Sequence, residues 1–301
     1  MTDLAGPPTA QDLADRTGYD PAFLGPGVPM PGVTTAAATA LLTYLHYSVL
    51  FRPDRKFAAV TALDLDGASL QNIVRTDKWL IDPRVPADVQ AGPRVYADND
   101  LDRGHLVMRA SSAWGNTMEE VRQAEAETFY FTNAAPQASM FNQGRELWLG
   151  LEEYLIRHAA TFDRKLAVFA GPILEPDDPP YRGIQIPLRF WKVVAFVQND
   201  ALAATGYILD QTPLVHDVDA VLAEAAAAGE APPLGAFRTF QVPIADIAVL
   251  AGVDLDQLVL VDRLGAPATG ETPPAPGRVS STWVQLDSLD DVVLDGPLSG
   301  K

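Results

Sequence analysis

Short runs of apolar, β-branched and aromatic residues recur along the chain, separated by residues that favour turns. Two such runs, residues 45–51 and 57–65, flank the sequence Arg52-Pro-Asp-Arg and predict a pair of strands joined by a turn. The same pattern predicts further strands at residues 106–107, 128–132, 166–170, 189–197, 203–209 and 235–242. Together these runs predict a sheet of several strands.

Three longer stretches have apolar residues at the spacing of an α-helix: residues 118–127, 144–160 and 244–251. Pro243 precedes the last stretch, where a proline fits the first turn of a helix. Strands and helices occur in comparable numbers, and they do not alternate strictly. The pattern therefore predicts an α+β fold with a central, mostly antiparallel sheet flanked by helices.

Both ends of the chain have the composition of turns and linkers. Residues 1–33 contain Pro-Gly and Gly-Pro pairs that favour extended structure, so we expect an N-terminal arm that wraps over the body or is partly loose. After Gly265, a stretch rich in proline, glycine and threonine leads to a segment with four aspartates. We therefore divide the chain into an arm (1–35), a folded domain (36–265), and a linker with an acidic tail (266–301).

Composition and charge narrow the function classes. The chain has no cysteine, which excludes disulfide scaffolds, thiolate zinc sites and cysteine nucleophiles. Its formal net charge of -17 excludes a protein that packages nucleic acid through a broad basic surface. Residues 75–109 differ from the rest, because their lysines and arginines are as numerous as their aspartates. An enzyme that releases a polyanionic product can work with a few well-placed arginines of this kind.

The sequence as written predicts a cytoplasmic protein without membrane contact. Its N-terminus lacks the basic start and the apolar run of a secretory signal. Its apolar stretches are shorter than the roughly 20 residues of a membrane-spanning helix. Secretion by another route stays open.

Polar residues suited to phosphodiester chemistry lie within residues 102–152. They occur in four motifs: Asp102-Arg-Gly-His-Leu, Phe131-Thr-Asn-Ala-Ala-Pro-Gln, Phe141-Asn-Gln-Gly and Leu147-Trp-Leu-Gly-Leu-Glu. On the predicted elements, His105 enters one strand and Asn133 ends the next. Asn142 then opens a helix that carries Glu152. Such a strand–strand–helix unit can supply the base, the cation ligand and the hydrogen-bond donors that phosphodiester hydrolysis needs.

These motifs resemble the DNA/RNA non-specific endonucleases of the ββα-metal type, a family that includes secreted bacterial sugar-non-specific nucleases and mitochondrial endonuclease G. The sequences that carry the resemblance are Asp102-Arg-Gly-His, Asn133 with Pro136-Gln137, Asn142-Gln-Gly, Trp148-Leu-Gly-Leu-Glu, Gly171-Pro172, Ile186-Pro187 and Phe190-Trp-Lys-Val. Altogether the match runs from about residue 46 to residue 262. The resemblance implies a ββα-metal nuclease fold, with residues 36–265 as the nuclease domain.

The resemblance also implies a metal site. In the family pattern, His105 is the general base that deprotonates the attacking water, and Asn142 binds a magnesium ion directly, with manganese as a substitute. Glu152 would hydrogen-bond the waters of that ion. The interval from Asn142 to the following tryptophan is about two residues longer than in the family pattern, so Glu153 and Glu146 are alternatives to Glu152.

Three further residues take roles by the same resemblance. Arg103 and the upstream Arg75 would stabilise the charge of the transition state at phosphate, and Asn133 would orient the site. The predicted function is therefore a metal-dependent endonuclease that cuts DNA and RNA with little sequence preference, because its contacts are to backbone phosphate. The alternatives are an RNA- or single-strand-specific phosphodiesterase, or a catalytically silent or autoinhibited module that binds nucleic acid. A homodimer stays open.

Overall fold

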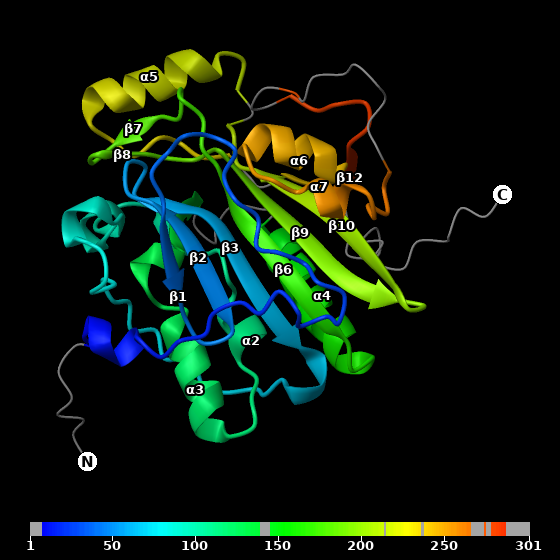
Figure 1. The fold of residues 1–301 in the computed structure, drawn as a ribbon. Coiled ribbons are helices and arrows are strands. Elements are labelled where there is room, and N and C mark those ends of the chain that lie inside the picture. The colour runs from blue at the N-terminus through cyan, green and yellow to red at the C-terminus, as the bar shows by residue number, and fades with distance from the viewer. Residues whose placement is uncertain are drawn as a thin grey trace.

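An antiparallel sheet of eight strands lies at the centre of the described part of the molecule (Figure 1). The structure is a computed structural model that describes residues 8–138, 145–213, 215–235, 238–265, 274 and 278–286, with only the backbone of residues 145–150. In order across the sheet, the strands are β1 (Ala40–Thr43), β2 (Tyr47–Arg52), β3 (Phe57–Asp66), β6 (Lys165–Ile173), β9 (Arg189–Gln198), β10 (Ala201–Asp210), β11 (Arg238–Val242) and β12 (Val284–Leu286). The predicted central antiparallel sheet is confirmed.

Seven α-helices surround this sheet in the described residues. They are α1 (Pro93–Tyr96), α2 (Arg109–Ser112), α3 (Met118–Glu127), α4 (Arg145–Thr161), α5 (Val218–Ala228), α6 (Ile244–Ala251) and α7 (Asp256–Val259). The predicted helices at residues 118–127 and 244–251 have the predicted bounds, and residues 145–160 of the third lie within α4. Among the described helices, none has the length and apolar character that crossing a membrane requires.

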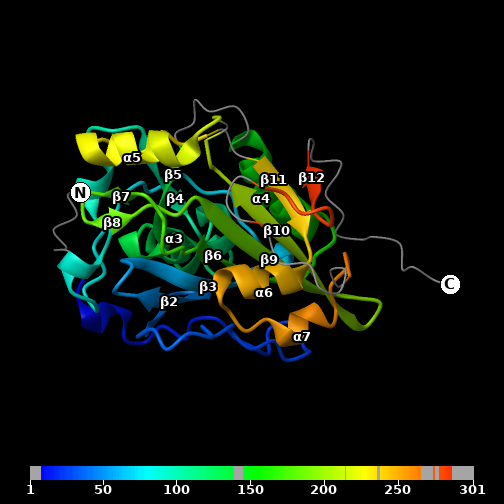
Figure 2. The ribbon, with the colours of Figure 1, turned by 90° about the horizontal axis from the view of Figure 1, so that it is seen from above.

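The two faces of the sheet carry two separate cores, because successive side chains of a strand point in opposite directions. Phe190 of β9 belongs to a core that includes Leu155 of α4. Trp191, the next residue, belongs to a core that includes Ile247 of α6 and Val28 of the N-terminal arm. Figure 2 shows α6, α7 and the arm on one side of the sheet and α4 on the other. Each fully buried large apolar side chain contributes about 1.5–3 kcal/mol.

Local sequence explains the strand predictions that are confirmed. β2 and β3 are antiparallel neighbours joined at the predicted turn, with Tyr47 opposite Leu63. The strands predicted at residues 166–170, 189–197 and 203–209 lie within β6, β9 and β10, and residues 238–242 form β11. Central strands such as β3 are buried along almost their whole length, because helices or chain segments cover both faces.

The strand predicted at residues 128–132 is wrong. Thr128 is the C-terminal cap of α3, and Phe131–Asn133 form the short 3-10 helix η4. A single parallel bridge joins Leu80 to Tyr130. The run is apolar and aromatic because its side chains are buried, and its backbone turns before it can form a ladder of strand hydrogen bonds.

A second, smaller pair of strands lies apart from the central sheet. β4 (Leu101–His105) is antiparallel to β5 (Ala134–Ala138), with His105 opposite Ala134 and Leu101 opposite Ala138. Helix α4 comes next in the chain, after residues 139–144, which lie outside the described part. The order strand, strand, helix confirms the predicted ββα-metal nuclease fold within an α+β protein.

The described parts of both terminal segments pack on the body. In the N-terminal segment, Tyr19 and Val28 are buried, and Val33 forms a bridge with Val253 next to α6. In the C-terminal segment, β12 pairs with β11, and the indole of Trp283 donates a hydrogen bond to Asp246 at 2.8 Å. These contacts give both segments a place in the core facing α6.

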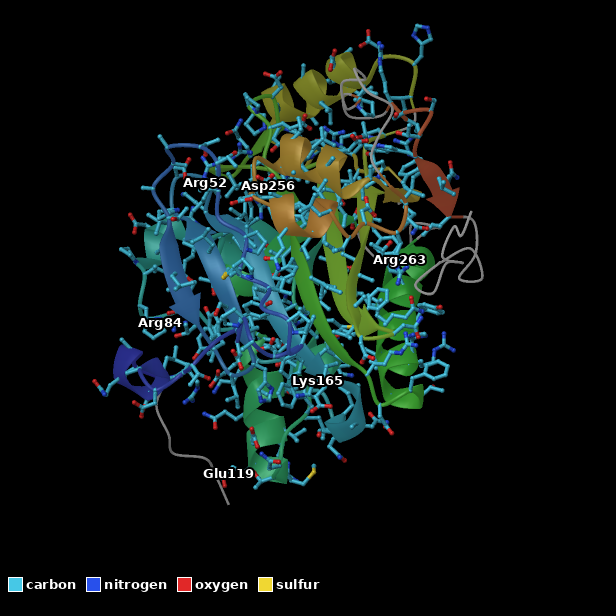
Figure 3. The ribbon with its side chains drawn as sticks, turned by 45° about the vertical axis from the view of Figure 1, so that its right-hand side comes forward. Arg52, Arg84, Glu119, Lys165, Asp256 and Arg263 are labelled. Carbon is cyan, nitrogen blue, oxygen red and sulfur yellow. The ribbon has the colours of Figure 1, made fainter. Side chains whose placement is uncertain are left out.

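The remaining short elements lie at the edges of these layers. They are the 3-10 helices η1 (Ala10–Leu13), η2 (Gly67–Ser69) and η3 (Ala87–Val89), and the strand pair β7 (Pro180–Tyr181) and β8 (Ile184–Gln185). The side-chain view in Figure 3 shows how densely the space between sheet and helices is filled.

Candidate active site

His105 is held between two aromatic rings at the end of β4. The centroid of its imidazole lies 4.6 Å from the ring centroid of Trp79 and 4.8 Å from that of Phe129. The imidazole and the Phe129 ring meet edge-on. Its Nε2 atom is buried and has no hydrogen-bond partner among the described residues. The two rings therefore set the orientation of the imidazole. Its Nε2 can accept a proton, since no described residue occupies it.

Three arginines place positive charge around this imidazole. The Arg103 guanidinium lies over the ring of Trp79 at 5.7 Å, and the Arg75 guanidinium lies over Phe129 at 5.5 Å. Burial of the ring, followed by the charges of Arg75 and Arg109, lowers the pKa of His105 to about 3. The imidazole is thus neutral at neutral pH, as a general base must be.

The low pKa has a consequence for substrate binding. A bound phosphate would offset the positive charge of the arginines, and this would move the pKa of His105 upward, toward its ordinary value. The basicity of His105 would then increase when an anion occupies the site. Arginines around the imidazole would therefore make His105 a stronger base when phosphate is bound than when the site is empty.

Asn133 supports the chain that follows His105. It is fully buried, and its Oδ1 accepts a hydrogen bond from the Val107 amide at 2.9 Å. Its Nδ2 donates to the carbonyls of Val107 and Thr128 at 3.0 and 2.9 Å. The side chain is therefore occupied by backbone groups, and it can act on the site by holding the segment after His105 in place.

The same contacts correct two expectations about the elements that carry the site. His105 ends β4 and does not enter a strand, and Asn133 precedes β5 and does not end it. The strand predicted at residues 106–107 is wrong, because the amide and carbonyl of Val107 bind the Asn133 side chain in place of a neighbouring strand. The apolar character of this segment reflects its burial.

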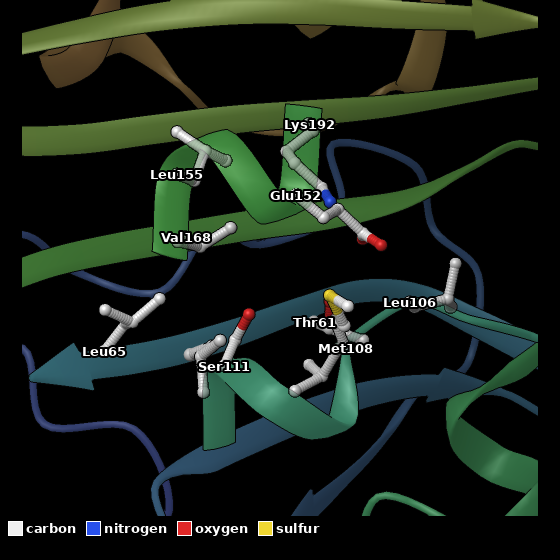
Figure 4. Close-up of a pocket in the computed structure, with 11 residues that line it drawn as sticks. Thr61, Leu65, Leu106, Met108, Ser111, Glu152, Leu155, Val168 and Lys192 are labelled. Carbon is white, nitrogen blue, oxygen red and sulfur yellow. The ribbon is translucent and has the colours of Figure 1, made fainter. Parts of the chain in front are cut away.

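Glu152 lies on α4 and faces the interior. Its Oε1 is 2.5 Å from Nζ of Lys192 on β9, and both side chains are almost fully buried. They line a small cavity of about 10 Å³, together with Leu106 and Met108 from the chain after His105 (Figure 4). This volume has room for about one water molecule.

The alternatives to Glu152 are placed differently. Glu153 is exposed. Glu146 belongs to the residues whose side chains are not described, and Asn142 lies outside the described part of the chain. Within that part, no group of three or more histidine, aspartate or glutamate side chains is placed to hold a metal ion. The metal role of Asn142 stays a prediction.

The structure places Arg75 and Arg103 near His105, and it adds neighbouring residues that the motifs do not indicate. Trp79 follows Arg75 closely in the sequence, but its aromatic character alone is as typical of a core residue. Arg109 lies at the end of the basic stretch of residues 75–109, and no motif gives it a role. The signal that could have indicated both is their proximity in sequence to the predicted arginine and histidine.

A larger hollow lies elsewhere, beside α5. Its volume is about 790 Å³, and it is lined by five carboxylates: Glu175, Asp177, Asp178, Asp217 and Asp219. Among its described lining residues, Arg278 and His216 are the basic ones. Such a lining repels phosphate, so size alone does not identify the site that suits a nucleic acid.

Comparison with known proteins identifies the family of the chain. A family model described as DNA/RNA non-specific endonuclease matches residues 27–262. An uncharacterized Sinorhizobium fredii protein, y4fB, is 37% identical over 283 residues, covering 85% of this chain and 41% of that protein. Mitochondrial endonuclease G of Bos taurus is 28% identical over 132 residues (40% of this chain, 41% of the relative), and mitochondrial nuclease EXOG of Danio rerio is 30% identical over 152 residues (46% and 42%).

The chain spans about two fifths of the length of each of these relatives. The family model, however, covers most of the chain, from the N-terminal arm to the end of α7. It includes β4, which ends at His105, and α4, which carries Glu152. The protein therefore belongs to the DNA/RNA non-specific endonuclease family.

Proposed function

We propose that this protein is a metal-dependent endonuclease that hydrolyses phosphodiester bonds of DNA and RNA with little sequence preference. The observation that carries the proposal is His105 in a chain of a nuclease family: its imidazole is neutral, arginines surround it, and its Nε2 has no hydrogen-bond partner among the described residues. A base beside positive charge suits the attack of water on a phosphodiester.

In the proposed reaction, His105 takes a proton from the attacking water as the new oxygen–phosphorus bond forms. Arg103 and Arg75 hold the negative charge that grows on the non-bridging oxygens. The bond to the leaving oxygen breaks, and that oxygen then takes up a proton from the solvent. The Arg103 guanidinium lies over the ring of Trp79 and that of Arg75 over the ring of Phe129, and these contacts favour the positions from which both groups can stabilise the charge.

A divalent cation, magnesium with manganese as a substitute, is part of the proposal. Asn142 would bind it, and Glu152 would hydrogen-bond its waters. Among the described residues, Glu152 offers a carboxylate beside a cavity with room for about one water molecule, and its Oε1 is paired with Lys192. When bound, the ion supplies positive charge that neutralises the phosphate and the leaving oxygen.

Little base preference would follow from the kind of groups present. The arginines around His105 suit phosphate, which carries no sequence information. The net charge of -17 favours release of a polyanionic product and disfavours tight, persistent binding. That charge is also the feature that favours the second candidate, a silent or autoinhibited module on the same scaffold.

The test is incubation of the protein with supercoiled plasmid and with single-stranded RNA, each in magnesium and in EDTA. His105→Ala is the test variant, and His216→Ala is the matched control because His216 is exposed and lies in the hollow beside α5. We expect cutting of both substrates in magnesium, retained by His216→Ala and lowered by about 10²–10⁴-fold in His105→Ala.

Each other outcome has a meaning. Cutting of RNA alone would favour the narrower phosphodiesterase. If His105→Ala cuts at the wild-type rate, His105 is not the general base. If neither substrate is cut, a variant that ends after Leu286 separates autoinhibition from a silent scaffold, because it removes the acidic residues that follow while keeping β12 in the sheet.

A further inference from the structure

Arg75 lies in a segment with few attachments to the body. Residues 71–79 have no helix or strand, and most of their side chains are exposed. Bridges at Leu70 with Trp114 and at Leu80 with Tyr130 fix the two ends. The position of Arg75, which is 52% exposed, therefore depends on what holds the middle of the segment.

Glu125 of α3 provides that middle attachment. Its Oε1 accepts a hydrogen bond from the Thr76 amide at 3.1 Å, and its Oε2 accepts one from the Thr76 hydroxyl. The glutamate is fully buried, so its hydrogen bonds are protected from competition by water. Thr76, the residue next to Arg75, is thereby attached to α3. Shortly after this helix comes Phe129, whose ring packs against His105.

The same carboxylate also faces Arg109. Nη1 of Arg109 lies 3.6 Å from Oε1 of Glu125, and the arginine side chain is 28% exposed. Arg109 begins α2, four residues after His105 in the chain. One buried glutamate therefore joins an arginine close to His105 with the segment that carries Arg75.

The charges give a reason for this arrangement. A phosphodiester carries one negative charge, and the proposed reaction already assigns it Arg75, Arg103 and a divalent cation. A third arginine brings more positive charge than one phosphate requires. It could instead neutralise the next phosphate of a nucleic-acid backbone. Since Arg109 keeps part of its surface open to solvent, it can reach such a group while Glu125 restricts its conformations.

We propose that Arg109 contacts a backbone phosphate next to the scissile one, and that Glu125 positions both Arg109 and the Arg75 segment. This proposal rests on the proposed nuclease function and deepens it. It makes the substrate a polynucleotide with at least two phosphates and disfavours small phosphodiesters with one. Arg109 is then a specificity-determining residue, and Glu125 is a positioning residue that does not touch the substrate.

The first experiment measures binding in EDTA, where turnover is suppressed. A fluorescein-labelled single-stranded DNA of about 12 nucleotides is titrated with the full-length protein, by anisotropy, at several salt concentrations. We expect Arg109→Gln to make the slope of log K against log salt shallower by about 0.7, the value for one lost phosphate contact on a single strand. Arg122→Gln on the exposed side of α3 is the matched control, and it should leave the slope unchanged.

The second experiment compares a polymer with a substrate that has one phosphate. With single-stranded DNA, kcat/KM of Arg109→Gln should fall roughly tenfold, as for loss of one charge-assisted hydrogen bond. With bis(p-nitrophenyl) phosphate, kcat/KM should fall by a clearly smaller factor than with the polymer, because that substrate has no second phosphate for Arg109 to contact. Equal losses on both substrates would assign Arg109 to the scissile phosphate and overturn the proposal.

Glu125→Gln tests the positioning role, because it removes the charge that faces Arg109 and one of the two acceptors for Thr76. We expect its slope of log K against log salt to become shallower, as in Arg109→Gln. In the double variant with Glu125→Gln and Arg109→Gln, the effects of the two substitutions should be non-additive. Thr76→Val is the second variant, made on the exposed partner in case the buried change prevents folding. It should raise KM for the polymer by about threefold with kcat retained, consistent with loss of one hydrogen bond.

The outcomes separate this proposal from the proposed function. If the wild type cuts DNA but Arg109→Gln has the same salt slope and polymer kcat/KM as Arg122→Gln, the assignment of Arg109 is wrong and the nuclease function stands. If neither the wild type nor the variant that ends after Leu286 cuts DNA or RNA, the nuclease function fails. The binding series then still shows whether Arg109 contacts phosphate, because it requires no turnover.

Discussion

The ring of Trp79 lies 4.6 Å from the imidazole of His105, with the two planes tilted by 50°. The Arg103 guanidinium lies over the same indole at 5.7 Å. One aromatic side chain thus contacts both the proposed base and a proposed phosphate ligand. Because Trp79 is also within 5.3 Å of Phe129, its position is set by the core beneath the site.

Replacing Trp79 should disturb both partners together. In Trp79→Ala, the imidazole loses a packing surface and gains water, so the pKa of His105 should rise from about 3 toward its ordinary value. We expect the nuclease rate to fall about tenfold through loss of orientation. NMR titration of the histidine ring protons, alongside activity assays, measures both effects. Trp79→Phe retains a ring and is the control; equal effects of the two variants would contradict this role.

The lowered pKa of His105 predicts a contribution to the pH dependence of stability. Between pH 6.5 and about 3, the unfolded chain binds a proton at this residue and the native state does not. The contribution is therefore complete above pH 6.5 and decreases as the pH falls toward 3. In His105→Asn, the free energy of unfolding should fall less between pH 7 and pH 5 than in the wild type.

Urea denaturation at the two pH values measures this difference. The exposed His216→Asn variant is the control for loss of a histidine. An unchanged pH dependence in His105→Asn would mean that the imidazole titrates normally in the native state.

Asn133 should matter for stability as well as for activity. In Asn133→Ala, two carbonyls and one amide of the chain lose their partners in a fully buried place. We expect the free energy of unfolding to fall by about 2–4 kcal/mol, and activity to fall in the fraction that stays folded. Urea denaturation measures the first effect, with the exposed Asn116→Ala as the control. A loss of activity without any loss of stability would instead indicate direct contact with substrate.

The buried pair of Lys192 and Glu152 predicts a coupling between two variants. Lys192→Met leaves a buried carboxylate without its closest cation, so the free energy of unfolding should fall by about 3–5 kcal/mol. The double variant Lys192→Met with Glu152→Gln removes both charges and should recover most of this loss. Thermal and urea unfolding measure the coupling; additive effects of the two changes would contradict it.

Periodic elements followed from local sequence. The helices α3 and α6 have the bounds that the spacing of their apolar residues predicts, and the strands β2 and β3 meet at the turn that the sequence after Phe51 predicts. In these places, a local pattern and local turn chemistry decide the structure. Tertiary contacts then only fix which face is buried.

Local patterns failed where distant groups take the backbone hydrogen bonds. Residues 106–107 are apolar, yet the side chain of Asn133, 26 positions away, binds the backbone of Val107. The aromatic run before Asn133 is buried, but its backbone turns between α3 and β5. A strand needs a neighbour as well as a suitable composition, and composition does not reveal the neighbour.

The sequence by itself determined the family, the α+β class and the motifs that contain His105, Arg103, Asn133 and Glu152, because these depend on residue identity and short spacings. Only the tertiary structure decided that Trp79 and Phe129 enclose His105. It also decided that Glu125 reaches Thr76 across 49 positions, and that Glu152 reaches Lys192 across 40. Such contacts have no period in the sequence, since they arise when the folded core brings side chains from separate elements into the same buried space.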